Sequence, residues 1–349
     1  MIWPTTSRPP SQGRHAVRPV VTRDHLQGVA RAALGAGHRL ASVSRLRGGS
    51  KKGVYRLTFD DGPAAIVYIW DDAESYWPTT QRDLPDNHAN PFSPASGMTL
   101  FEAAHRRLDD AGIRTPRIHL TDRSRNHYPA DIAVVEDIPG ENLEVLLRRD
   151  PGGAQSTMAR LADALDAMRR TLGPRFGKVA LIDSGGTSDG TSCQQVVLDR
   201  ALDDLNEAAS RDSRITRARD QLETVARALA ATVRPRSEFG LIHGELGPDH
   251  VLVDRHGVPV LIDIEGLMFF DIEWEHAFLR LRFREHYRCL ARSDLDEQRL
   301  TFYTLAMHLS LAAGPLRLLD GDFPDRDFML DIIEHNLQKA LTYLPASNH

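Results

Sequence analysis

The order of the predicted secondary structure is the feature of this sequence that most limits its fold. Short strand-like apolar runs lie in the first part of the chain, and helical patterns dominate after Pro139 and Gly140. Strands followed by helices, rather than alternating with them, are typical of an α+β protein. The chain has 349 residues, which is enough for two lobes. We therefore expect a lobe built on a sheet and a second, mainly helical lobe, joined near residue 137.

The predicted elements divide the chain into a disordered tail over residues 1–22, an N-lobe over 23–137 and a C-lobe over 138–349. The tail is rich in Pro, Ser and Arg. The N-lobe is expected to hold a mostly antiparallel sheet with strands at 40–46, 54–59, 65–70, 117–121 and 132–136, and helices at 25–36 and 100–111. The C-lobe is expected to hold helices at 143–149, 156–172, 194–209 and 214–233, a hairpin over 251–264, and helix from there to about residue 344. Residues 71–97 and 173–192 read as loops.

Composition removes several functional classes. The chain has 43 basic and 48 acidic residues and a net charge of −5, which argues against a nucleic-acid partner. Its two cysteines, Cys193 and Cys289, form neither a disulfide framework nor a cysteine zinc site. No apolar run approaches the ~20 residues of a membrane span, and the first twenty residues lack a signal-peptide pattern. We therefore expect a cytoplasmic protein with no membrane partner.

The segment from Leu241 to His276 carries the clearest chemical signal. Asp263 lies within the apolar run of residues 260–264, where an unpaired carboxylate would be costly. Such an acid needs a partner, and a metal ion is one. Glu245 and His250 lie on the preceding loop, which the hairpin brings back toward Asp263. A cluster of this kind suits Mg²⁺.

Two motifs in this segment resemble the catalytic core of the aminoglycoside phosphotransferase family. Residues 243–250 read HGELGPDH, where that family has H-G-D-L-x-x-x-N, and residues 261–264 read LIDI, where it has a metal-binding I-D-[FW] strand. The resemblance implies a bilobal protein-kinase-like fold. It also implies ATP or GTP and Mg²⁺ as cofactors, and transfer of the γ-phosphoryl group to a hydroxyl of a small-molecule acceptor.

The same resemblance implies a role for each candidate residue. Glu245 matches the catalytic base, and His243 matches the histidine that braces the catalytic loop. Asp263 and His250 match the metal ligands. The remaining matches concern the nucleotide: Glu136 and Ile138 fall in the hinge that contacts the adenine, and Glu102 falls on the helix that supplies the partner of the phosphate-binding lysine. Asp271 and Glu275 match two acids of the following segment, the second of which steadies the catalytic loop.

Three of these positions depart from the family pattern. Glu245 replaces an aspartate and is one methylene longer, and His250 replaces an asparagine. Tyr68 stands where the third strand usually carries its lysine. A carboxylate misplaced by ~1 Å can cost ~10²-fold in rate, so activity with Glu245 requires a compensating shift of the loop or the substrate.

The missing lysine has few possible replacements, because the chain has only four lysines: Lys51, Lys52, Lys178 and Lys339. Two of them lie in the turn between the first two strands, with Gly49 and Ser50. This turn resembles that of the "with no lysine" protein kinases, in which the cation moves to this position. We hypothesise that Lys52, or else Lys51, binds the nucleotide phosphates, supported by Arg47 and the turn amides.

Two other readings of the sequence remain open. The three substitutions are also compatible with a non-catalytic nucleotide- or metabolite-binding protein, or with a kinase-like cleft that performs another reaction in secondary metabolism. The acceptor site is expected among the C-lobe helices, where acids and arginines are mixed. A polycationic aminoglycoside needs a dense acidic patch and is therefore not favoured. A monomer and a homodimer are equally compatible with the sequence.

Overall fold

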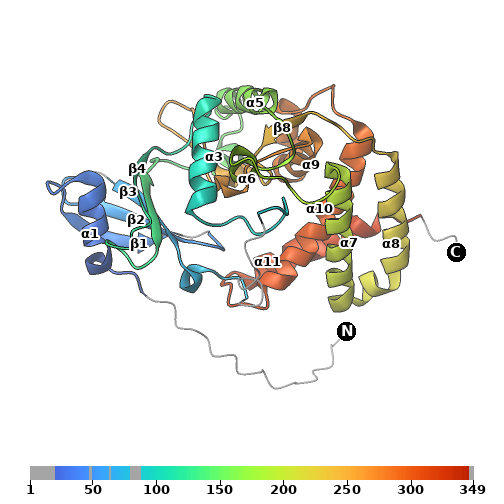
Figure 1. Cartoon of the computed structure of the whole chain (residues 1–349), viewed down its shortest axis with the longest axis horizontal. Helices are drawn as coiled ribbons and strands as arrows, with labels where there is room; N and C mark the ends of the chain where they lie inside the picture. The colour runs from blue at the N-terminus through green and yellow to red at the C-terminus, as the bar shows by residue number, and fades with distance from the viewer. Residues whose placement is uncertain (1–19, 47–48, 63, 79–87, 346–349) are drawn as a thin grey trace, which may run out of the picture.

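The computed structural model describes residues 20–46, 49–62, 64–78 and 88–345, and its two lobes are seen side by side in Figure 1. The expected tail therefore lies outside the described residues except for positions 20–22, and Arg47 lies outside them too. No helix in the described part of the chain is long and apolar enough to cross a membrane.

The N-lobe contains one five-stranded sheet in the order β1-β2-β3-β5-β4, in which every neighbouring pair is antiparallel. This confirms the predicted sheet. Its elements are α1 (Arg23–Leu34), β1 (Leu40–Arg45), β2 (Gly53–Phe59), β3 (Ala64–Trp70), the 3₁₀ turn η1 (Asp72–Glu74), α3 (Met98–Asp110), β4 (Ile118–Asp122) and β5 (Asp131–Glu136).

The two faces of this sheet are covered by different helices. Alternate residues of β3 point to opposite faces, and the five central residues are all buried because both faces are covered. Helix α1 packs Leu26 and Val29 in one cluster with Val67 of β3. On the other face, Tyr68 joins Phe101 of α3 in the larger core that continues into the C-lobe. The tyrosine at the usual lysine position therefore faces the junction of the lobes.

The C-lobe is mainly helical, as predicted. Its helices are α4 (Leu143–Arg149), α5 (Gln155–Arg170), α6 (Val179–Asp183), α7 (Cys193–Arg211), α8 (Ser213–Thr232), α9 (Ile272–Phe283), α10 (Glu297–Leu318) and α11 (Arg326–Leu341), with the 3₁₀ turns η2 (Pro248–His250), η3 (Ile264–Gly266) and η4 (Arg284–Cys289). The long helices α7, α8, α10 and α11 pack against one another, with α7 and α8 at the end of the lobe away from the sheet (Figure 1).

A small four-stranded sheet in the C-lobe was not expected from the sequence. It consists of β6 (Leu172–Gly173), β8 (Phe239–Ile242), β11 (Met268–Phe270) and β7 (Gly177–Lys178), in that order. The prediction of a loop over residues 173–192 is therefore wrong for β7 and α6. Strands of two to four residues are too short to show a periodic pattern, and these pair with segments far away in the sequence.

The short strands place the chemical segment between the lobes. Strand β8 leads directly into the loop that begins at His243, and the hairpin of β9 (Val251–Val253) and β10 (Pro259–Leu261) leads to Asp263. The prediction that Asp263 lies inside a strand is wrong, because β10 ends at Leu261 and Asp263 has a left-handed backbone (φ 58°, ψ 45°). The 3₁₀ turn η3 begins at the next residue and contacts α3.

Candidate functional site

Lys52 connects the N-lobe turn to the acids of the C-lobe. Its Nζ donates to Asp263 Oδ1 at 3.0 Å and also contacts the Glu265 carboxylate of η3. The same Nζ lies 4.9 Å from the ring centroid of Tyr68, close enough for a cation–π contact. The structure thus brings together the candidate cation, the candidate metal acid and the residue that replaces the usual lysine.

The three charged groups of this cluster differ in exposure. The side chains of Lys52 and Glu265 are 8% and 4% exposed, whereas that of Asp263 is 46% exposed. Burial alone would lower the pKa of Lys52, but the Glu265 and Asp263 carboxylates raise it above its ordinary value. In return, the Lys52 ammonium holds the pKa of Asp263 well below its usual range. Lys52 and Asp263 are therefore both charged at neutral pH.

The turn that carries Lys52 is held by its neighbours. Gly49 has a positive φ of 72°, and a Cβ there would lie 2.8 Å from the Lys52 carbonyl oxygen, so the turn requires glycine at this position. Trp77 Nε1 donates to Ser50 Oγ at 3.1 Å, and Lys51 Nζ lies 5.7 Å from the Trp77 ring centroid. Lys51 thus lies over the indole, whereas Lys52 meets the acids.

The catalytic-loop candidates lie where β8 ends. His243 is buried, and its Nε2 donates to the Ile262 carbonyl at 3.0 Å, next to Asp263. Burial lowers the pKa of His243 to about 4, so the imidazole is neutral at pH 7. Glu245 is exposed and faces away from the core. The loop is thus braced by a neutral histidine and presents a carboxylate to solvent.

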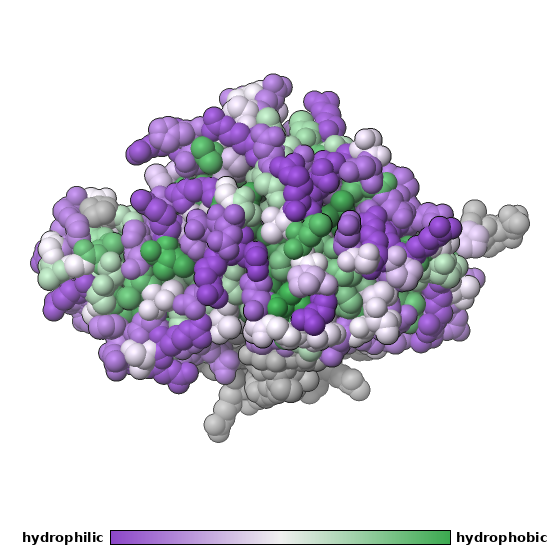
Figure 2. Space-filling model, turned by 45° about the horizontal axis from the view of Figure 1, so that its top comes forward, coloured by the Kyte–Doolittle hydropathy of each residue, from purple (hydrophilic) through white to green (hydrophobic). Residues whose placement is uncertain are grey.

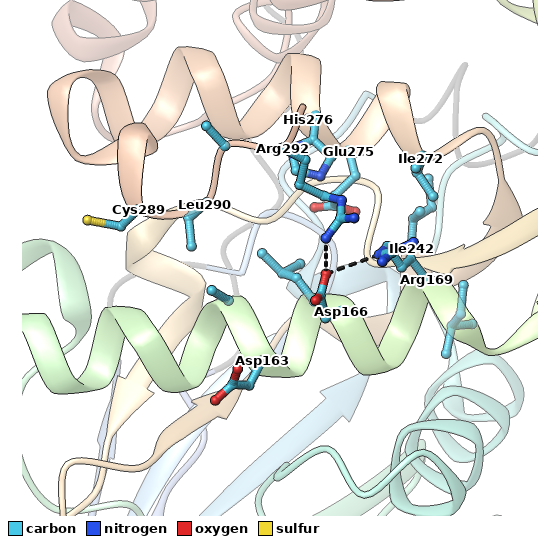
Figure 3. Close-up of a pocket in the computed structure, with 14 residues that line it drawn as sticks. Asp163, Asp166, Arg169, Ile242, Ile272, Glu275, His276, Cys289, Leu290 and Arg292 are labelled. Atoms are coloured by element: carbon cyan, nitrogen blue, oxygen red, sulfur yellow. Dashed lines mark hydrogen bonds and ion pairs between the residues drawn. The ribbon is translucent and has the colours of Figure 1, made fainter. Parts of the chain in front are cut away.

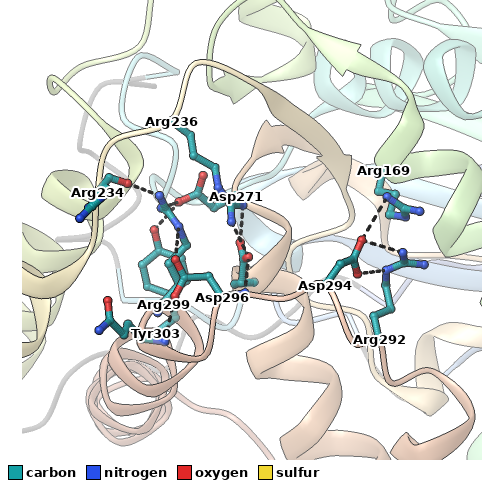
Figure 4. Close-up of polar contacts among 11 residues, drawn as sticks. Arg169, Arg234, Arg236, Asp271, Arg292, Asp294, Asp296, Arg299 and Tyr303 are labelled. Atoms are coloured by element: carbon teal, nitrogen blue, oxygen red, sulfur yellow. Dashed lines mark hydrogen bonds and ion pairs between the residues drawn. The ribbon is translucent and has the colours of Figure 1, made fainter.

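Glu275 of α9 stabilises this loop through a hydrogen bond to its backbone. Its Oε2 accepts the Gly244 N–H at 2.7 Å, and burial raises the pKa of Glu275 to about 7. Asp271, at the start of the same helix α9, accepts the Tyr303 hydroxyl at 2.6 Å and contacts the guanidinium of Arg299. Figure 4 shows this buried network at the N-terminal end of α9. These contacts fix the helix that carries Glu275.

His250 faces the metal candidate Asp263. Its Nδ1 lies 2.9 Å from the Glu245 carbonyl oxygen, which can only accept, so Nδ1 carries the proton. Nε2 of the same ring lies 3.9 Å from Asp263 Oδ2. Among the described residues no group of three or more His, Cys, Asp or Glu side chains forms a ready metal cage. One carboxylate and one imidazole fit Mg²⁺ only where phosphate oxygens complete its coordination, as is usual for nucleotide-bound Mg²⁺.

The structure places Glu102 away from this cluster. Its carboxylate lies 2.6 Å from Arg123 Nη2, and Glu265 takes the place beside Lys52 that was expected for Glu102. Glu265 lies two residues after Asp263 in the sequence. Its spacing of two residues from Asp263 carries no directional information here, because the chain has already left the strand at Leu261.

The two residues predicted for the hinge, Glu136 and Ile138, lie apart from the Lys52 cluster in their contacts. Glu136 accepts from Arg114 at 2.6 Å and from Arg117 at 3.2 Å. Burial acts to raise the pKa of Glu136, but the hydrogen bonds and charges of Arg114 and Arg117 together lower it. Ile138 is buried. Both line a cleft of about 500 Å³ that also borders α3 and the turn between β9 and β10. The Glu136 side chain is thus paired with two arginines.

A second cavity of about 200 Å³ lies under the loop, between α5, β8 and α9 (Figure 3). Glu275 and Ile242 line its inner side. One of its acids is paired with two arginines: Asp166 accepts from Arg169 at 3.0 Å and also contacts Arg292. Figure 2 likewise shows hydrophilic and apolar residues interspersed over one face of the molecule. The cavity does not offer the dense acidic surface that a polycation requires.

The fold matches solved structures of phosphotransferases. A thermostable mutant of aminoglycoside phosphotransferase APH(4)-Ia superposes with a TM-score of 0.58 at 15% identity, over 86% of this chain and 95% of that one. Spectinomycin phosphotransferase APH(9)-Ia, in complex with ADP and spectinomycin, gives 0.59 at 13% identity over 93% and 99%. Choline kinase LicA from Streptococcus pneumoniae gives 0.59 at 13% identity over 91% and 100%. These likenesses confirm the protein-kinase-like fold.

Sequence comparison gives the family. None of the curated proteins compared with this sequence matches it significantly. The model of the phosphotransferase enzyme family (APH), however, matches residues 42–309, which include the sheet, the lysine turn, the catalytic-loop candidates and Asp263. This match covers most of the chain and agrees with the resemblance of the two motifs. The chain therefore belongs to the APH phosphotransferase enzyme family.

Proposed function

We propose that this protein transfers the γ-phosphoryl group of ATP or GTP to a hydroxyl of a small metabolite or antibiotic. The observation that carries the proposal is the contact between Lys52 and Asp263 across the lobes, at 3.0 Å. Phosphoryl transfer depends mainly on positioning and on neutralising phosphate charge. This chemistry needs a cation beside the phosphates and an acid that binds the metal ion. Lys52 and Asp263 would supply these two groups, and they lie in contact here.

Each residue has a defined task in the proposed reaction. Asp263, with His250 beside it, would hold Mg²⁺ on the nucleotide phosphates, and the ion would neutralise charge that develops during transfer. Lys52 would pair with the phosphates, and the amides of the Gly49 turn would cover them. The exposed Glu245 carboxylate would take the proton of the acceptor hydroxyl, whose oxygen forms the new bond to phosphorus while the bond to the β-phosphate oxygen breaks. ADP or GDP leaves.

The acceptor is proposed to be a small molecule with a hydroxyl group. The related structures contain or are named for hygromycin B, spectinomycin and choline as small-molecule partners or substrates. In the cavity beneath the loop, Asp166 pairs with Arg169 and Arg292, which favours an acceptor of low or mixed charge over a polycation. We propose no nucleic-acid or membrane partner, a cytoplasmic location, and either a monomer or a homodimer.

The proposal is tested by calorimetry with ATP and with GTP, each in the presence of Mg²⁺, and by nucleotide hydrolysis in the absence of an acceptor. We expect binding and slow hydrolysis, and we expect Asp263→Asn to abolish the hydrolysis because the metal loses its carboxylate. Glu245→Gln should leave nucleotide binding unchanged. Once an acceptor has been identified by screening, the same variant should reduce its phosphorylation rate by ~10²-fold or more. Absence of nucleotide binding in the wild-type protein would refute the proposal.

The three substituted motif positions favour one alternative, a nucleotide-binding protein that has lost transfer. That protein would bind Mg²⁺-nucleotide through Lys52 and Asp263, but no acceptor in a broad panel would be phosphorylated. Glu245→Gln would then alter neither binding nor hydrolysis. A cleft used for a different reaction in secondary metabolism would bind no nucleotide at all.

A further inference from the structure

The partner of Lys52 comes from an unexpected part of the chain. Glu265, on the 3₁₀ turn after Asp263, contacts Lys52 Nζ, whereas Glu102 of α3 is engaged by Arg123 at 2.6 Å. We propose that Glu265 is the residue that positions Lys52 for the nucleotide phosphates, the task that was expected of Glu102. The inference rests on the proposed function, because it gives Lys52 a phosphate to bind.

The difference in burial indicates which of the two acids stays with the lysine. Glu265 is 4% exposed, so removing Lys52 from it would leave an unpaired carboxylate in the interior, which is strongly unfavourable. Asp263 is 46% exposed and can lose the lysine while water or a metal ion takes its place. Glu265 is therefore the permanent partner of Lys52, and Asp263 is the exchangeable one.

The donors of Lys52 allow this exchange. An ammonium group carries three N–H donors, and two of them are directed at Asp263 and Glu265. When Asp263 turns to a metal ion, Lys52 regains one donor for a phosphate oxygen and remains fixed by Glu265. Tyr68, which stands at the sequence position of the usual lysine, supports the same placement, since its ring centroid lies 4.9 Å from Nζ. Both charged partners of the relocated cation thus come from the segment after β10, and the N-lobe helix supplies neither.

The test compares Glu265→Gln with the matched control Glu102→Gln, by calorimetric titration with ADP and Mg²⁺. We expect Glu265→Gln to weaken binding about tenfold or more, the loss of one charge-assisted contact, and Glu102→Gln to change it less than about twofold. Because Glu265 acts through Lys52, adding Glu265→Gln to Lys52→Met should weaken binding no further. Equal effects of the two glutamine variants, or a full additional loss in the double variant, would overturn the inference.

A second measurement does not depend on nucleotide. Acetylation by acetic anhydride, followed by mass spectrometry, reports the reactivity of Lys52 against Lys339 as an internal reference. We expect Lys52 to react slowly in the wild-type protein and in Glu102→Gln, and faster in Glu265→Gln. Equal Lys52 reactivity in all three proteins would contradict the inference.

If the wild-type protein binds no nucleotide, the proposed function fails, and the acetylation comparison alone decides whether Glu265 holds Lys52. Should Glu265→Gln not fold, Glu265→Asp, which keeps the charge but is one methylene shorter, takes its place, and Lys52 should again react faster than in the wild-type protein.

Discussion

Replacing Lys52 by methionine tests the lysine–acid cluster most sharply. Methionine keeps the length and apolar stem of the side chain and removes only the charge. In the folded protein Glu265, 4% exposed, would lose its ionic partner, while Asp263, 46% exposed, would be solvated. Breaking a buried pair by removing one member costs ~3–5 kcal/mol. Since only one of the two acids is buried, we expect a loss at the lower end, about 3 kcal/mol in the free energy of unfolding.

Urea unfolding, followed by intrinsic fluorescence, measures this loss. Lys51→Met is the matched control: it removes the neighbouring charge, which lies over Trp77 and outside the acid pair, and should cost less than ~1 kcal/mol. Adding Glu265→Gln to Lys52→Met should restore most of the stability, because no buried charge then remains unpaired. A free energy of unfolding for Lys52→Met that equals that of Lys51→Met would refute the reasoning.

Three further predictions concern the loop, the turn and the network under α9. Burial raises the pKa of Glu275 from 4.5 to about 7, so its proton stabilises the fold fully below pH 4.5, and this contribution is lost as the pH rises through 7. Between these pH values the wild-type protein should lose about 3 kcal/mol more stability than Glu275→Gln, as measured by urea unfolding at each pH. Gly49→Ala should weaken Mg²⁺-nucleotide binding in calorimetry and cost ~1–2 kcal/mol, because of the positive φ and the 2.8 Å approach to the Lys52 carbonyl; unchanged binding would contradict the role of the turn. Tyr303→Phe should cost ~1–2 kcal/mol in unfolding, because the buried Asp271 loses a 2.6 Å hydrogen bond; no loss would mean that Arg299 alone satisfies it.

Much of the fold could be predicted because its longer elements carry a local pattern. Strand β2 alternates buried and half-buried residues, and β3 is a short continuous apolar run. Helix α4 has the predicted bounds, Leu143–Arg149. The four-stranded sheet of the C-lobe could not be predicted in this way. Its strands β6 and β7 have two residues each and depend on pairing with β8 and β11, which follow much later in the chain. No local signal specifies such contacts.

The candidate site was predictable in its members and less so in its connections. The motifs of residues 243–250 and 261–264 identified the loop and the acid, and the scarcity of lysine directed attention to the turn at residues 51–52. Which acid meets Lys52 depends on the left-handed backbone of Asp263 and on the turn that follows it, a conformation that non-glycine residues rarely adopt. The capture of Glu102 by Arg123 is likewise a tertiary contact between α3 and the segment after β4.

A crystal structure with Mg²⁺ and a non-hydrolysable ATP or GTP analogue tests the central claim most directly. The account predicts that Lys52 Nζ lies within hydrogen-bond distance of a phosphate oxygen while it still contacts Glu265, and that Asp263 has turned from the lysine to the metal ion. A bound nucleotide whose phosphates are reached by Lys51 or an arginine instead of Lys52, or a Lys52 that remains on Asp263 with no phosphate contact, would contradict it.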